Sequence, residues 1–188
     1  MTTLCVVVKN GEVGLATDGL SVAGNTRVPG RETKLIRFTD TLFVVSGYVA
    51  HHRALLSALT LLSERQTVDL STEESIFQVL TDLHPILKER FFTETDEDED
   101  HQPYESSQLW YMLANSHGAF AVSSFRHVKQ ISSYWAQGSG SDYALGSMFT
   151  QYESAKTAAQ VARVGVEAGC AFDIYSGPPI TVEAIGLA

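Results

Sequence analysis

The order of strands and helices along the chain is the feature that most restricts its fold. Thr2 to Lys9 and Val13 to Thr17 are rich in β-branched and apolar residues, and Asn10-Gly11 between them is a strong signal for a two-residue hairpin. Leu35 to Phe38 and Leu42 to Ser46 form a second pair of predicted strands, joined by a short polar turn. The chain therefore opens with antiparallel strand pairs.

Helices are predicted next, followed by further strands and a second pair of helices. Apolar residues recur at helical spacing over Ala50 to Arg65 and over Ser71 to Arg90. Ser71 and Glu74 form a capping box that predicts the start of the second helix, and Pro85 within it predicts a kink or a break. The remaining predictions are a turn region at Gly19 to Gly30, strands at Gln108 to Ser116, Ala119 to Ser124, Val128 to Ala136 and Ile180 to Ile185, and helices at Ser141 to Tyr152 and Ala155 to Ala168.

This order is not an alternating β-α-β series, and its hairpins favour antiparallel sheets. Two stacked sheets with a pair of helices on each outer face would bury the pattern, which predicts an α+β fold. The 188 residues, of which 44% are apolar and 19% charged, fit a single globular domain over 1–188. No apolar run approaches the roughly 18 residues that span a bilayer, so no membrane partner is expected.

The negative charge of the chain is concentrated in one place. The formal net charge is -9, and six of the 22 acidic residues lie between Glu94 and Asp100, which leaves 16 acidic against 13 basic residues elsewhere. This balance excludes a nucleic-acid partner, because phosphate binding needs clustered Lys and Arg. The acidic run defines an insert at about 93–103. A solvated loop is its ordinary interpretation, and a loop that lines a chamber and repels acidic peptides is the alternative.

The other sequence signals concern location and metal binding. The first residues lack the basic segment and apolar core of a secretory signal, which predicts a cytoplasmic protein. Cys5 and Cys170 have no CxxC pattern or nearby His, so buried thiols are expected rather than a disulfide or a zinc site. His51 and His52 would point about 100° apart on a helix, which favours a polar helix start over a metal site.

Thr2 is the first candidate for chemistry. A small residue after Met1 favours removal of the methionine, which in many proteins is only routine trimming. An exposed α-amine has a pKa of roughly 7.7 to 8.0 and can take the proton from its own hydroxyl, so one residue can supply both nucleophile and general base. A lysine held by a carboxylate would assist, and Asp18 and Lys34 are placed on neighbouring predicted strands. Taken singly, these two residues are better explained as a turn aspartate and an exposed lysine.

Several separated segments together resemble the catalytic β-subunits of proteasomes. The matching segments are Met1-Thr2-Thr3, Ala16-Thr17-Asp18-Gly19, Gly24-Asn25-Thr26, Lys34, Gly138-Ser139-Gly140 and Asp173-Ile174-Tyr175-Ser176-Gly177. They are most similar to the bacterial HslV type and to the bacterial proteasome homologues (BPH). The resemblance implies the four-layer αββα sandwich of N-terminal nucleophile hydrolases and a threonine-type endopeptidase.

The same resemblance implies roles for individual residues. Thr2 would be nucleophile and base, Lys34 would tune its pKa, and Asp18 would hold Lys34 in place. Ser139, Asp173 and Ser176 would form a hydrogen-bonding network around the new N-terminus. A helix N-cap at Ser139 and an Asx turn at Asp173 to Ser176 are the structural alternatives. Substrate binding would fall to Leu20, Ser21, Val22, Ser46, Gly47 and Tyr48.

One segment departs from the family pattern. Where the family has a glycine-rich oxyanion segment, this chain has Ser46-Gly47-Tyr48-Val49-Ala50-His51-His52, which lacks the second and third glycines and places Tyr48 at the pocket. Any backbone N–H can build an oxyanion hole, so the loss of glycine is not the loss of a donor. A chamber subunit with the same fold and little or no activity is therefore an alternative function, and a small-molecule amidase is another.

The resemblance also implies partners. The substrate would be a peptide or unfolded protein, with no cofactor and no metal. The subunits would form a homo-oligomer of stacked rings. The segment at Asp173 to Ser176 resembles the seven-membered type, which favours 14 subunits, whereas the start of the chain resembles the six-membered HslV rings, which makes 12 the alternative. An ATPase unfoldase is a further candidate partner.

Overall fold

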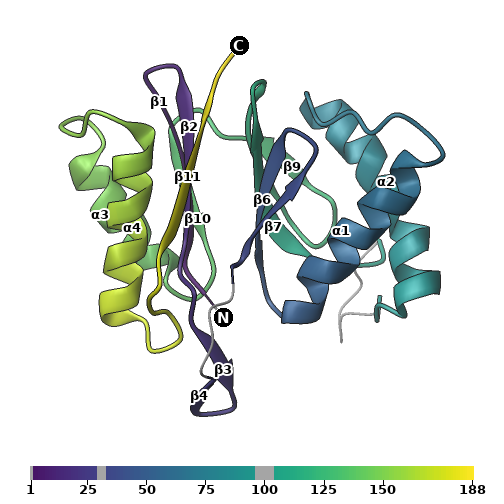
Figure 1. The fold of residues 1–188 in the computed structure, drawn as a ribbon, viewed down its shortest axis with the longest axis horizontal. Helices are drawn as coiled ribbons and strands as arrows, with labels where there is room; N and C mark the ends of the chain where they lie inside the picture. Colours follow the sequence, from purple (N-terminus) through teal and green to yellow (C-terminus); the bar gives the residue numbers. More distant parts are fainter. Residues whose placement is uncertain (1, 29–32, 96–103) are drawn as a thin grey trace.

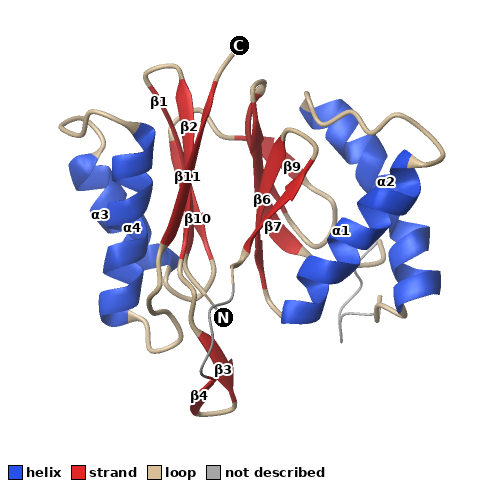
Figure 2. Ribbon diagram, in the orientation of Figure 1, coloured by secondary structure: helices blue, strands red, loops and turns tan. Residues whose placement is uncertain are grey.

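Two antiparallel sheets are stacked face to face, and helices cover the outer face of each (Figure 1). The computed structural model describes residues 2–28, 33–95 and 104–188. The alternation of helical and sheet layers is plain in Figure 2. The predicted α+β fold, a four-layer αββα sandwich, is confirmed.

Each sheet combines strands from distant parts of the chain. The first has the order β10-β1-β2-β11 and consists of β1 (Leu4–Lys9), β2 (Glu12–Thr17), β10 (Tyr134–Gln137) and β11 (Thr181–Gly186). The second has the order β5-β6-β7-β8-β9 and consists of β5 (Leu35–Phe38), β6 (Thr41–Ser46), β7 (Trp110–Asn115), β8 (Gly118–Val122) and β9 (Val128–Gln130). A short ribbon of β3 (Ser21–Ala23) and β4 (Thr26–Val28) projects beyond the first sheet.

The helices lie in pairs on the two outer faces. α3 (Ser141–Gln151) and α4 (Ala158–Phe172) cover the first sheet, and α1 (Val49–Ser63) and α2 (Glu73–Phe91) cover the second. No helix in the described parts of the chain is long and apolar enough to cross a membrane.

Three apolar layers hold the sandwich together. In β1, Leu4 and Val6 face the core between the two sheets, whereas Cys5 and Val7 face the core beneath α3 and α4. Successive side chains of a strand point to opposite faces, so a strand buried on both faces is a continuous apolar run. This explains the sequence of β1. The third core lies between the second sheet and the helices α1 and α2.

The predicted opening hairpin is confirmed. Lys9 pairs with Glu12, and the two residues between them, Asn10 and Gly11, have φ values of 51° and 76°. Positive φ at both turn positions matches the right-handed twist of the paired strands, and Asn-Gly is the sequence that tolerates it best.

The predicted capping box of α2 is wrong by one residue. The Ser71 amide donates to the Asp69 carboxylate, which leaves Ser71 in the preceding turn. Thr72 is the N-cap: its Oγ1 accepts from the Ser75 amide at 3.1 Å, and Ser75 Oγ accepts from the Thr72 amide at 3.1 Å. The helix then continues through Pro85 without a break.

The structure corrects three other boundaries. The predicted strand Val128 to Ala136 is two strands, because the chain crosses at residues 131–133 from the edge of the second sheet to the edge of the first. The turn region Gly19 to Gly30 contains the exposed ribbon of β3 and β4. α4 begins at Ala158 rather than Ala155, because Thr157 and Gln160 form its capping box.

Two other sequence predictions concern the insert and the cysteines. Residues 96–103 of the acidic insert lie outside the described residues. Cys5 is buried and Cys170 is partly buried, and neither is in a disulfide.

Candidate active site

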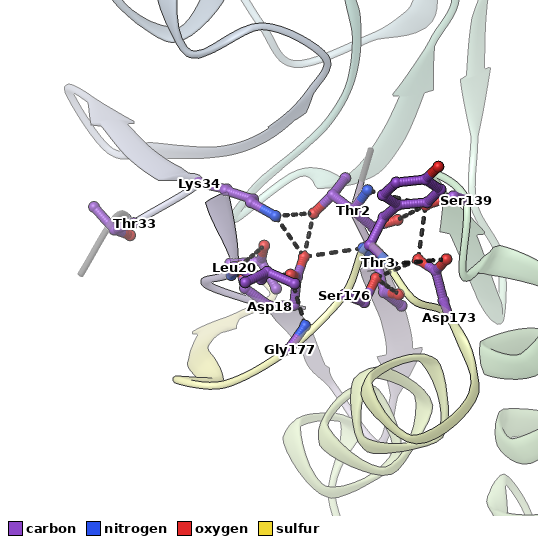
Figure 3. Close-up of polar contacts among 12 residues, drawn as sticks. Thr2, Thr3, Asp18, Leu20, Thr33, Lys34, Ser139, Asp173, Ser176 and Gly177 are labelled. Atoms are coloured by element: carbon purple, nitrogen blue, oxygen red, sulfur yellow. Dashed lines mark hydrogen bonds and ion pairs between the residues drawn. The ribbon is translucent and has the colours of Figure 1, made fainter. Parts of the chain in front are cut away.

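Three segments of the chain converge at Thr2 (Figure 3). It precedes β1, Asp18 follows the neighbouring strand β2, and Lys34 precedes β5 of the other sheet. The Asp18 amide donates to the Thr3 carbonyl at 3.2 Å, and the Lys34 carbonyl accepts from the Val45 amide at 3.1 Å, so both residues are fixed by backbone hydrogen bonds. Thr2, Asp18 and Lys34 are all buried, with Thr2 only 1% exposed.

Asp18 connects the three segments. Lys34 Nζ donates to Asp18 Oδ1 at 2.7 Å, and Thr2 Oγ1 also donates to this oxygen. Backbone amides supply three further donors, from Thr3 to Oδ1 at 3.0 Å and from Leu20 and Gly177 to Oδ2 at 3.1 Å each. A buried carboxylate is tolerated when its charge is paired and its oxygens are hydrogen-bonded, as they are here.

Lys34 therefore has a fixed position beside the Thr2 hydroxyl. Its Nζ donates to Thr2 Oγ1 at 2.6 Å while the same ammonium group is bonded to Asp18. A cation this close to the hydroxyl oxygen would stabilise an alkoxide formed there.

A second hydrogen-bonding chain reaches the backbone nitrogen of Thr2. Thr2 N donates to Ser139 Oγ at 3.2 Å, and Ser139 Oγ donates to Asp173 Oδ2 at 2.7 Å. Ser176 Oγ donates to the same carboxylate oxygen at 2.6 Å and lies 2.7 Å from Thr3 Oγ1. Each serine hydroxyl has one hydrogen, and Asp173 takes both. Ser139 therefore faces Thr2 N as an acceptor.

The structural alternative for Ser139, a helix N-cap, is absent. α3 has Gly140 as its N-cap and no side-chain cap bond. The Asx turn that was the alternative for Asp173 is present, because the Tyr175 amide donates to Asp173 Oδ1 at 3.3 Å. It coexists with the hydrogen bonds to Ser139 and Ser176.

Gly138 allows the segment before α3 to approach the backbone of Thr2. Its φ is +96°, a value that favours glycine, and an added Cβ would lie 2.1 Å from the Thr2 carbonyl oxygen. The Gly140 amide donates to the same carbonyl at 3.3 Å. The position of Thr2 thus depends on a backbone contact that no other residue at 138 would permit.

A pocket of about 450 Å³ opens beside Thr2 and Lys34. Five of the six predicted substrate-binding residues line it: Leu20, Ser21, Val22, Gly47 and Tyr48. Ser46 does not line it, and its hydroxyl donates to the Trp110 carbonyl at 3.0 Å. We call this cavity the catalytic pocket.

Sequence reasoning missed three residues of the catalytic pocket, Gly24, Val45 and His52. His52 is buried rather than part of a polar helix start, and its Nε2 lies 3.0 Å from the Val45 carbonyl oxygen. No local sequence pattern distinguishes these residues from core or turn residues, because the packing of α1 against β6 is what places Val45 and His52 at the pocket.

The cysteines are poor candidates for the nucleophile. Burial, with a smaller contribution from the Asp18 charge, raises the pKa of the Cys170 thiol to about 11. Burial also raises the pKa of Cys5 far above its usual range. A thiol with a raised pKa is protonated at neutral pH and unreactive. Thr2 is the hydroxyl with a cation beside it.

The chain is similar to known proteins over nearly its whole length. No family model matches the chain. It is 25% identical over 190 residues to a proteasome subunit beta of Nanoarchaeum equitans, covering 98% of this chain and 93% of that one. Among solved structures, Thiobacillus denitrificans BPH in complex with epoxomicin is 32% identical, with a TM-score of 0.86 and 99% of both chains covered.

Two further solved structures are similar. Another structure of Thiobacillus denitrificans BPH is 32% identical, with a TM-score of 0.85, over 99% of this chain and 98% of that chain. HslV from Trypanosoma brucei has a TM-score of 0.74 over 98% of this chain and 99% of its own, which shows a shared fold. Its sequence is 14% identical.

Proposed function

The chain belongs to the family of proteasome β-subunits and HslV-like proteins, and on that premise we propose that it is a threonine endopeptidase subunit that acts through Thr2 after Met1 is removed. One observation carries the proposal. Lys34 Nζ lies 2.6 Å from Thr2 Oγ1, on the wall of a pocket large enough for a substrate side chain.

Removal of Met1 would convert the Thr2 nitrogen from an amide into an amine. A free α-amine has a pKa of about 7.7 to 8.0, so a substantial fraction is neutral at physiological pH and can accept a proton. Ser139 Oγ supports this role, because its only hydrogen is donated to Asp173. It can accept one amine hydrogen and leave the nitrogen lone pair for the Thr2 hydroxyl.

Asp18 is the other group that could accept the hydroxyl proton, because Thr2 Oγ1 donates to it in the structure. Asp18 Oδ1 already accepts from Lys34 and from the Thr3 amide. These two bonds occupy the lone pairs of Oδ1, so this oxygen has no free position for the hydroxyl proton. We therefore assign the base to the amine and the positioning of Lys34 to Asp18.

The proposed reaction is acyl transfer in two steps. The amine takes the hydroxyl proton while Oγ1 attacks the peptide carbonyl carbon, and the oxyanion forms near the backbone around Gly47, which lines the same pocket. The protonated amine gives its proton to the leaving nitrogen, the peptide bond breaks, and an ester on Thr2 remains. Water, activated by the same amine, then hydrolyses the ester and restores the free hydroxyl.

The family also supports a proposal for the assembly and the location of the protein. Proteasome and HslV proteins form stacked rings and act on peptides, and for this chain we propose 14 subunits, with 12 as the alternative. An unfolded protein would be the natural substrate, an ATPase unfoldase would be a partner, and the cytoplasm would be the location. One domain over 1–188 would carry these functions.

The decisive experiment separates a peptidase from an inactive chamber subunit. The purified particle is incubated with epoxomicin, the compound in complex with the similar BPH, and the intact subunit is weighed by mass spectrometry. We expect a mass without Met1 that increases on incubation, and the Thr2→Ala variant to show no increase. Thr2→Ser, which keeps a hydroxyl, is the matched control. A wild-type subunit without Met1 that remains unmodified and cleaves no peptide would favour the chamber subunit.

A further inference from the structure

A second pocket adjoins the catalytic pocket and shares Tyr48 with it. Its volume is about 510 Å³, and we call it the side pocket. It lies between the start of α1 and the segment that follows α2. Its principal lining residues are Tyr48, His51, Ala54, Phe91, Phe92 and Glu94. None of the roles assigned above to the catalytic residues uses this pocket.

Aromatic side chains line the side pocket, and two of them are largely exposed to solvent. Tyr48 is 78% exposed, and Phe92 is 87% exposed. Phe92 is the C-cap of α2 and has a φ of 54°, in the left-handed region that favours glycine. Bulky residues in this region are uncommon, and they concentrate at ligand clamps and functional sites. Two exposed aromatic rings beside the same cavity provide a surface for a planar or cationic group.

The charge of the side pocket is negative. Glu94 is exposed and forms no ion pair within the described parts of the chain. His51 is partly buried, and this burial lowers its pKa, so its ring is neutral at pH 7 and does not oppose a cation.

We propose that the side pocket is a second subsite for the peptide substrate and that it accepts an arginine side chain. In an extended peptide, residues two apart point to the same side and lie about 6.5 Å from each other. A substrate with one side chain in the catalytic pocket would therefore present the side chain two residues away to the far side of Tyr48. The guanidinium group would stack on Phe92 or Tyr48 and pair with Glu94. This inference rests on the proposed function.

The test uses peptides in which one residue is expected to place its side chain in the catalytic pocket. The peptides differ only at the positions two residues before and two residues after it. These positions carry Arg, Phe, Ala or Asp, and kcat/KM is measured with the assembled particle. A cation on an aromatic ring together with an exposed ion pair favours Arg over Ala by about 3- to 30-fold. Glu94→Gln should reduce the preference for Arg and leave the rate for Phe unchanged, whereas Phe92→Ala should reduce both. Phe77→Ala, an exposed residue of α2 outside both pockets, is the matched control.

The outcomes separate this inference from the proposed function, because cleavage of the Ala peptide reports on the catalytic residues alone. Equal rates for Arg and Ala in the wild type, or an Arg preference that survives Glu94→Gln, would overturn the inference. So would Phe92→Ala particles of altered size with unaltered peptide preference, which would mean that a second copy of the chain covers the pocket. A wild-type particle that cleaves none of the peptides overturns the proposed function and this inference together.

Discussion

Replacing Lys34 tests the electrostatic part of the proposed mechanism most directly. Lys34 Nζ lies 2.6 Å from Thr2 Oγ1, which at an effective dielectric constant of about 20 gives an attraction on the order of 6 kcal/mol for a full alkoxide charge. The transition state carries only part of that charge. Removal of one group that stabilises developing charge typically reduces kcat by about 10² to 10³, or roughly 3 to 4 kcal/mol. We expect this loss for Lys34→Met.

The same substitution also affects stability, because it leaves the Asp18 carboxylate buried without its ion partner. Breaking a buried pair by removing one member costs about 3 to 5 kcal/mol. The double variant Lys34→Met with Asp18→Asn removes both charges and should recover much of this stability, measured by urea unfolding. It should not recover activity. A loss of folding and a loss of catalysis are thereby distinguished.

The assay is cleavage of a fluorogenic peptide by the assembled particle, with KM and kcat measured separately. Lys34 contacts the hydroxyl rather than the pocket entrance, so kcat should fall while KM changes little. Asp18→Asn, which keeps the shape of the side chain, should cost less than Lys34→Met. A folded Lys34→Met particle with kcat within tenfold of the wild type would refute the role of Lys34.

Three further predictions follow. A particle whose subunits retain Met1 should have no peptidase activity, and mature activity should rise with pH between about 6.5 and 8.5 as the amine loses its proton; full activity with Met1 present by mass would contradict this. Ser139→Ala should lower kcat by about tenfold or more with little change in unfolding free energy, because it removes the acceptor that orients the amine; an unchanged kcat would rule out the orienting role. Deletion of residues 96–103 should reduce the preference for basic over acidic peptides at 0.1 M salt and have no effect at 1 M, where the Debye length is about 3 Å; identical ratios would mean that the insert is only a solvated loop.

The parts of the fold that were predictable are those in which local pattern and tertiary packing agree. β1 was predictable because both of its faces are buried and its residues from Leu4 to Val8 are all apolar. Asn10-Gly11 was predictable because the turn itself demands positive φ. The division of Val128 to Ala136 into two strands was not, because Ile131 packs against the core between the sheets just as a strand residue would, and only Ser132 and Ser133 separate it from the next strand. Only the positions of the partner strands distinguish the two cases.

The candidate site divides in a similar way. Thr2, Asp18 and Lys34 were identifiable through the resemblance to proteasome β-subunits, because taken singly each of them has an ordinary structural explanation. Val45 and His52 were not, because a buried apolar residue at the end of a strand and a histidine on a helix become pocket residues only through the placement of α1 against β6. Ser46 was assigned to the pocket as part of the segment that stands where the family has its glycine-rich segment. Val45 lines the pocket from β6 instead, and residues adjacent on a strand point to opposite sides.

The two hydrogen-bonding chains at Thr2 act on different atoms and depend on different parts of the fold. Lys34 reaches Oγ1 from the second sheet, whereas Ser139 reaches the nitrogen from the segment between β10 and α3. Thr2 itself is fixed by Gly138, whose missing side chain lets the Thr2 carbonyl approach. Because the sheets pack through a continuous apolar core, the oxygen and the nitrogen keep their partners only while the whole sandwich is intact. The nucleophile and its base are then assembled by tertiary packing, although they belong to a single residue.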